Sequence, residues 1–175
     1  MTWPRRHPKL GWVHTGFAAG PDAIHPKIAA SLPDKGVPRV YTGHSKGGAE
    51  AILGAALACL AGHNVKFLIV FNPPRSTLGT RVLEILASHG VVMLRIVARG
   101  DPVSHLPPFF MGYSHLFDPS YVGQGWDAAP DHPLRAVYKD MIHERLANGT
   151  LIAGRAAAKL AWARDLGPNS SAAPG

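Results

Sequence analysis

Residues 37–61 read VPRVYT-GHSKGG-AEAILGAALACLA, and this stretch decides the fold. Residues 37–42 are rich in β-branched and aromatic side chains, which predicts a short buried strand. Residues 49–61 are dominated by Ala and Leu, which predicts a helix. The segment between them matches G-x-S-x-G, a pattern that places a serine on a sharp turn between a strand and a helix. Ser45 is therefore the candidate nucleophile, and the backbone N–H of Lys46 is the candidate oxyanion donor.

Two glycines flank this serine at equal distances. Gly43 and Gly47 lie two residues before and two residues after Ser45. We expect both to lack a Cβ because the strand and the helix pack closely at such a turn. A glycine-rich turn with an incidental serine is the alternative interpretation.

Buried strands and helices alternate along the rest of the chain. This order predicts an α/β fold with a mostly parallel sheet and helices on both faces. Residues 1–166 are expected to form one domain, and residues 167–175 (GPNSSAAPG) a disordered tail. Further strands are predicted at 65–71 and 91–98, helices at 21–32, 77–88, 133–147 and 151–166, and irregular structure over 99–131.

Composition excludes several classes of protein. The chain has 175 residues, 46% of them apolar, and one cysteine, which excludes internal disulfides. It contains no apolar run long enough to span a membrane and no visible signal peptide, so we expect a cytoplasmic protein. The net charge is +7, but the cations are scattered and do not alternate with aromatic residues. Nucleic acid is therefore an unlikely partner, whereas weak association with an anionic surface stays open. The histidine spacing fits no metal motif, and neither a metal nor another cofactor is predicted.

Four ordered segments resemble the motifs of the class 3 lipases, α/β-hydrolases related to the fungal triglyceride lipases. The match spans about residues 11–140, and it implies a serine ester hydrolase. The segments are GHSKGGAEA (GHSLGGA in the family), VHTGF at 13–17 (VHxGF), FNPPR at 71–75 (FGxPR, with Asn72 for Gly), and DPVSHLPP at 101–108 with GYSH at 112–115 (DxVPxLPP…GYxH, with Ser104 for Pro).

The resemblance also indicates the acid and the base of a catalytic triad. Asp101 follows a predicted strand and is implied to be the acid, although an aspartate that only caps the Gly-Asp-Pro turn is the alternative. The base should follow Asp101 in the chain. His132 lies in DHPLRAVY, which resembles the family's DHxxY segment, although Tyr138 falls two residues later than in its shortest form. His132 is the candidate base, and His115 is the alternative.

The beginning of the chain departs from the family. Only ten residues precede Gly11, and they contain no Arg-Gly-Thr/Ser segment, whose hydroxyl supplies the other oxyanion donor in the family. We expect a minimal fold that lacks the N-terminal strands and the lid. Thr15 or a second subunit could replace the missing donor, or activity could be low.

The leading hypothesis is a serine carboxylic-ester hydrolase. Without a lid, short-chain, medium-chain or soluble esters are the expected substrates, rather than emulsified fat. A non-catalytic or weakly active binding or assembly protein with the same fold is the alternative. The sequence predicts neither the acyl-chain length nor the oligomeric state.

Overall fold

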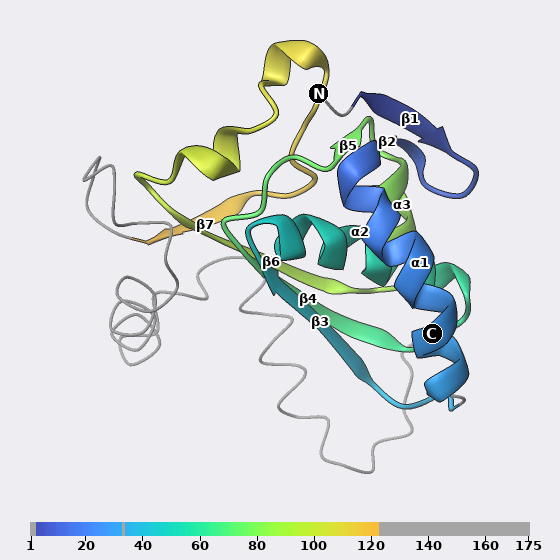
Figure 1. Cartoon of the computed structure of the whole chain (residues 1–175). Coiled ribbons are helices and arrows are strands. Elements are labelled where there is room, and N and C mark those ends of the chain that lie inside the picture. Colours follow the sequence, from blue (N-terminus) through green and yellow to red (C-terminus); the bar gives the residue numbers. More distant parts are fainter. Residues whose placement is uncertain (1–2, 33, 123–175) are drawn as a thin grey trace.

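The centre of the fold is a parallel sheet of four strands. The structure is a computed structural model, and it describes residues 3–32 and 34–122. The strands are ordered β3-β4-β6-β7, and neighbouring strands are parallel, which confirms the predicted sheet (Figure 1). Their bounds are Arg39–His44 for β3, Val65–Phe71 for β4, Val92–Ala98 for β6 and Pro119–Val122 for β7.

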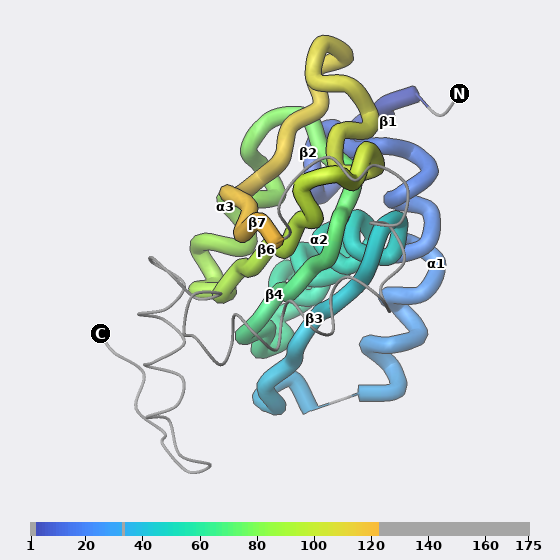
Figure 2. Tube along the Cα trace, turned by 90° about the vertical axis from the view of Figure 1, so that its left-hand side faces the viewer, coloured from blue at the N-terminus to red at the C-terminus, as the bar shows by residue number. Residues whose placement is uncertain are grey.

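The three described helices cover one face of this sheet (Figures 1 and 2). They are α1 (Thr15–Ser31), α2 (Lys46–Leu60) and α3 (Arg81–Ser88), and α2 packs directly on β3 and β4. The connections β3–α2–β4 and β4–α3–β6 run in the same direction across the sheet. Right-handed crossovers then place both helices on the same face. The helices expected at 133–147 and 151–166 lie outside the described residues, so helical cover of the second face stays a prediction.

The helix α2, which packs on β3 and β4, is apolar nearly all round. From Gly48 to Cys59, every residue of α2 except Glu50 is buried. Such a helix belongs in the core rather than at the surface. Burial raises the pKa of the Cys59 thiol to about 11, which agrees with the core position expected for this cysteine.

A small antiparallel sheet that sequence analysis did not predict lies beside the first helix. It consists of β1 (Pro4–His7), β2 (Gly11–His14) and β5 (Thr77–Leu78). The helix predicted over 77–88 is therefore wrong in its first residues, because Thr77 pairs with Val13 of β2. The helical spacing is real only from Arg81 onward.

The start of α1 was also predicted wrongly. The sequence predicted this helix over residues 21–32. The structure begins it at Thr15, with Pro21 and Pro26 inside it. Each proline lacks the N–H that would bond one turn back. Packing against α2, with Ala18 and Pro21 buried, holds the helix despite those losses.

The region expected to be irregular contains some regular structure. Two short 3₁₀ helices, Pro102–His105 and Phe109–Met111, follow β6, and β7 begins at Pro119. The strand was missed because it has only four residues and its first residue is proline. The predicted tail at 167–175 and the domain limit at 166 lie outside the described residues. No helix in the described part of the chain is long and apolar enough to cross a membrane.

Candidate active site

Ser45 lies on a strained turn between β3 and α2. Its φ is 53° and its ψ is −129°, a conformation that residues other than glycine rarely adopt. Its backbone N–H donates to the Phe71 carbonyl (2.9 Å), and its carbonyl accepts from the N–H groups of Gly48 (2.9 Å) and Ala49 (3.2 Å). A strain of roughly 1–3 kcal/mol persists only where the surroundings fix the backbone in this way, and it is typical of functional sites.

At this turn the close packing requires the absence of a side chain at Gly43 and Gly48, but not at Gly47. A Cβ on Gly43 would lie 2.2 Å from the Gly47 carbonyl oxygen. A Cβ on Gly48 would lie 3.1 Å from the Gly43 carbonyl oxygen, whereas a Cβ on Gly47 would meet nothing within 4 Å. The prediction that Gly47 avoids a clash is therefore wrong, because its Cα faces open space.

The start of α2 supplies N–H groups next to Ser45, the candidate nucleophile. Lys46 is the first residue of the helix, and the first N–H groups of a helix have no partner within it. The helix dipole adds partial positive charge at this end. The Lys46 side chain forms an ion pair with Glu50, one turn along the helix. The backbone N–H of Lys46 is thus suited to a developing negative charge next to Ser45.

Asp101 is buried at the same edge of the sheet. The register pairs His44 with Phe71 and Phe71 with Ile96, so the carboxyl ends of β3, β4 and β6 lie side by side. Asp101 comes three residues after β6 and has 1% of its surface exposed. Ser45 and Asp101 therefore follow strands two spacings apart, roughly 10 Å.

One carboxylate oxygen of this aspartate also has a structural role. Oδ1 of Asp101 accepts a hydrogen bond from the Val103 N–H (2.8 Å), which caps the first 3₁₀ helix. Asp101 therefore does cap this turn, as the alternative interpretation expected. This bond does not exclude a catalytic role, because a carboxylate has two oxygens and several acceptor positions.

Of the two candidate bases, the structure describes only His115. His132 lies outside the described residues. His115 donates from Nε2 to the Ser104 carbonyl oxygen (2.6 Å), since a carbonyl can only accept. Burial, with a contribution from the nearby Arg95 charge, lowers the pKa of His115 to about 4. A partly buried imidazole with that pKa is a poor base near neutral pH.

Side chains from the other family-like segments converge on this end of the sheet. Arg75 of FNPPR donates to the carbonyl oxygens of His105 and Pro107, the second at 2.9 Å. His14 of VHTGF lies against Tyr113 of GYSH, with ring centroids 5.7 Å apart. Separate sequence motifs are thus joined by direct contacts, and the loop after Asp101 is held by an arginine from the neighbouring strand end.

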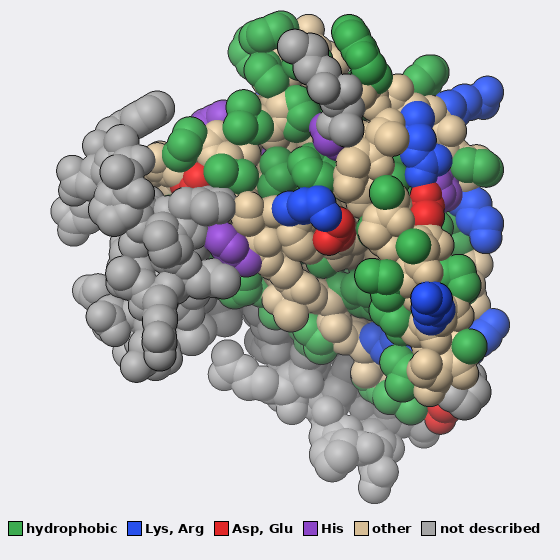
Figure 3. Space-filling model, in the orientation of Figure 1, with side chains coloured by type: hydrophobic (Ala, Val, Ile, Leu, Met, Phe, Trp, Pro, Cys, Tyr) green, Lys and Arg blue, Asp and Glu red, His purple; other side chains and the backbone are tan. Residues whose placement is uncertain are grey.

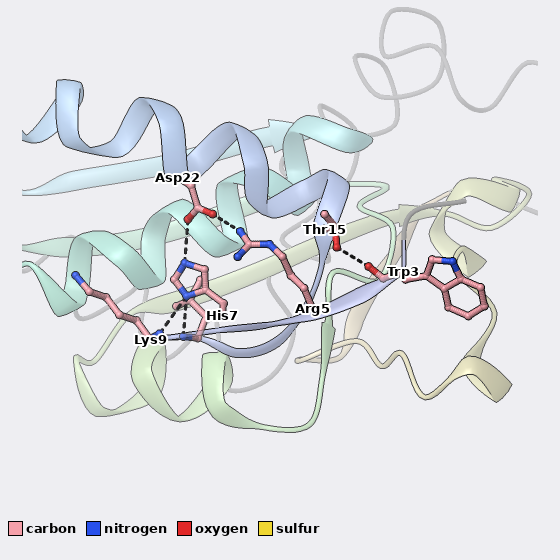
Figure 4. A network of polar contacts seen from close by, with 7 residues as sticks. Trp3, Arg5, His7, Lys9, Thr15 and Asp22 are labelled. Carbon is pink, nitrogen blue, oxygen red and sulfur yellow. Dashed lines mark hydrogen bonds and ion pairs between the residues drawn. The ribbon is translucent and has the colours of Figure 1, made fainter.

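The Thr15 hydroxyl already forms a hydrogen bond. It donates to the Trp3 carbonyl oxygen at 2.5 Å (Figure 4). This bond uses the proton that Thr15 would need to serve as an oxyanion donor.

A polar network that sequence analysis missed ties the first hairpin to α1 (Figure 4). Asp22 pairs with Arg5 and accepts from Nε2 of His7 (2.9 Å). Nδ1 of His7 accepts from the N–H groups of Lys9 and Leu10, both at 3.1 Å. Both ring nitrogens of His7 are thus hydrogen-bonded, and the network fixes β1 on the helix.

Apolar side chains are exposed on the loop that follows Asp101. Phe109 and Phe110 are 75% and 78% exposed, and Leu106 and Met111 are also exposed. Figure 3 shows hydrophobic side chains at this end of the molecule. A separate hollow of about 200 Å³ lies between α1 and α2, and Ser45 is not among the residues that line it. Within the described residues no three potential metal ligands cluster.

Comparisons with known proteins by sequence and by structure both find lipases. The family model of the class 3 lipases matches residues 4–111. The structure of Rhizomucor miehei triacylglyceride lipase is 26% identical, with a TM-score of 0.61, and the match covers 71% of this chain and 51% of that chain. A triacylglycerol lipase described as having a serine protease triad at its catalytic centre is 25% identical, with a TM-score of 0.58 and the same coverage.

A third structure shares the fold. The mono- and diacylglycerol lipase of Aspergillus oryzae is 24% identical, with a TM-score of 0.63, over 81% of this chain and 51% of that chain. The chain thus spans about half the length of these solved relatives. No curated protein matches it.

Proposed function

The chain belongs to the class 3 lipase family, and on that premise we propose that it is a serine carboxylic-ester hydrolase that forms an acyl-enzyme on Ser45. The strained backbone of Ser45 at the start of α2 carries this proposal. Such a turn presents the hydroxyl beside helical N–H groups, the arrangement that acyl transfer requires.

The proposed reaction uses three side chains and one backbone group. His132 accepts the Ser45 proton as Oγ bonds to the ester carbonyl carbon, and the Lys46 N–H stabilises the resulting oxyanion. Asp101 orients His132 and stabilises its protonated form. The intermediate then breaks its bond to the alcohol, which leaves with the proton from His132. Water, deprotonated by His132, attacks the acyl-enzyme, releases the carboxylic acid and restores Ser45.

The proposed substrates are short-chain, medium-chain or soluble esters. The apolar surface around Phe109 and Phe110 supports an ester with an apolar part. The hydrogen bond from Thr15 to Trp3 favours one alternative, a weakly active or non-catalytic binding protein, because it occupies a candidate oxyanion donor.

A panel of p-nitrophenyl esters with two to sixteen carbons tests the proposal. Ser45→Ala should reduce hydrolysis to the background rate, and wild type should prefer the shorter esters. Ser31→Ala is the matched control, since Ser31 is exposed at the end of α1 and bonds only to the Lys27 carbonyl oxygen among the described residues. Parental activity in Ser45→Ala would refute the proposal.

Two further expectations belong with this proposal. A cytoplasmic location is supported by the single cysteine, which is unpaired and buried; recovery of the protein outside the cytoplasmic fraction would contradict it. Weak association with anionic surfaces is supported by the net charge of +7. Co-sedimentation with anionic vesicles that persists at high salt would contradict that electrostatic explanation.

A further inference from the structure

The carboxyl end of β4 lies between the candidate nucleophile and the candidate acid. On one side, the Phe71 carbonyl accepts the Ser45 N–H (2.9 Å). The next residue, Asn72, is completely buried and has a φ of 43°. Apart from glycine, asparagine is one of the few residues that adopt this left-handed conformation readily.

Asn72 binds the other side through both its backbone and its side chain. Its N–H donates to the Ile96 carbonyl (2.9 Å), and its Oδ1 accepts from the Ala98 N–H (2.8 Å). The Ala98 carbonyl in turn accepts the Asp101 N–H (3.1 Å). A continuous path of short hydrogen bonds and covalent links therefore joins the Ser45 turn to Asp101.

The side-chain bond depends on the residue by which this chain departs from the family motif. A glycine at position 72 would accept the same backbone conformation, but it would supply no acceptor for the Ala98 N–H. Ala98 is 1% exposed. A buried N–H that loses its partner is costly, so the strand end would move or open to find another.

We propose that Asn72 is a positioning residue, which fixes the loop carrying Asp101 relative to the Ser45 turn. The inference rests on the proposed function, since it concerns the acid of the same triad. Asn72 acts through Ala98 and the backbone of Asp101, and it needs no contact with substrate.

Residue-resolved amide hydrogen exchange on the full chain tests the hydrogen-bond path without any reference to activity. Asn72→Gly should raise the exchange rates of Ala98 and Asp101 about tenfold and leave those of residues 92–96 unchanged. The matched control is Asn64→Gly, at the opposite end of β4, where the side chain donates to the Gly36 carbonyl (2.7 Å). The control should leave the exchange of Ala98 and Asp101 at the wild-type rate.

The kinetic arm tests positioning against a merely structural role. Asn72→Gly should lower kcat about tenfold and change KM less than twofold. It should also move the acid limb of the pH–rate profile to lower pH. A well-placed Asp101 carboxylate raises the pKa of the base, so a looser one lets that pKa fall. A purely structural defect would lower activity equally at every pH.

The outcomes are distinguishable. Wild-type exchange rates at Ala98 and Asp101 in Asn72→Gly would overturn the proposal, as would faster exchange with unchanged kcat and acid limb. If wild type neither hydrolyses esters nor reacts with a fluorophosphonate, the proposed function fails, and faster exchange then shows only a structural role for Asn72. If Asn72→Gly does not fold, Asn72→Asp, which keeps an acceptor, should retain wild-type protection of Ala98, and loss of that protection would overturn the proposal.

Discussion

Replacing Gly43 with alanine is expected to destabilise the turn that carries Ser45. The new Cβ would lie 2.2 Å from the Gly47 carbonyl oxygen and 2.5 Å from the Gly47 carbonyl carbon. Both distances are about 1 Å shorter than a normal contact, and both atoms belong to the backbone of α2, which cannot rotate away. Overpacking of this kind costs about 3 kcal/mol, which corresponds to a fall in Tm of roughly 6–12 °C.

Gly47→Ala is the matched comparison in the same turn. Its Cβ would meet nothing within 4 Å, and alanine favours helix over glycine. We expect this variant to be as stable as wild type or up to about 1 kcal/mol more stable. Urea unfolding followed by circular dichroism measures both values. A Gly43→Ala variant within about 0.5 kcal/mol of wild type, or a Gly47→Ala variant equally destabilised, would refute the reasoning.

Three other substitutions test separate parts of the structure. Arg75→Ala should cost about 2 kcal/mol and speed amide exchange at His105 and Leu106, because it removes a charged donor from the loop carbonyls; unchanged exchange would contradict this. When the pH falls from 6.5 to about 4, wild type should lose about 2 kcal/mol more of its free energy of unfolding than His115→Asn does. In that range the His115 imidazole takes up a proton in the unfolded chain but not in the folded one, where its pKa is lowered. The same pH profile of stability in wild type and His115→Asn would contradict a neutral His115 in the folded chain. Asp22→Ala should cost about 2 kcal/mol of stability, because it leaves the His7 N–H without its acceptor, whereas Asp22→Asn should cost less. Equal losses of stability in the two variants, measured by thermal unfolding, would refute this hydrogen bond.

The sequence predicted best the segments whose structure depends on local chemistry. The apolar run 65–71 became β4 with the expected bounds, because a strand buried within a parallel sheet needs apolar residues on both faces. The GHSKGG turn was likewise predictable, since the strand, the serine and the helix are all visible within 25 residues. Only the bounds were wrong, because β3 spans Arg39–His44 rather than 37–42, and α2 spans Lys46–Leu60 rather than 49–61.

The errors came from contacts between distant segments. Nothing near Thr77 indicates that it pairs with Val13, and nothing near Pro21 indicates that packing on α2 would hold a helix through it. The role of Gly48, rather than Gly47, depends on how closely α2 approaches β3. The bond from Asn72 to Ala98 joins two strand ends that only the sheet brings together.

The most direct test of the central claim is the site at which the full chain reacts with a fluorophosphonate. Such a reagent forms a covalent bond with a serine whose hydroxyl is activated by a base. We expect a single labelled residue, Ser45, identified by peptide mass spectrometry, and no labelling after Ser45→Ala or after prior heat unfolding. Folded wild-type protein that stays unlabelled, or that is labelled at another serine, would contradict the claim that Ser45 is the nucleophile.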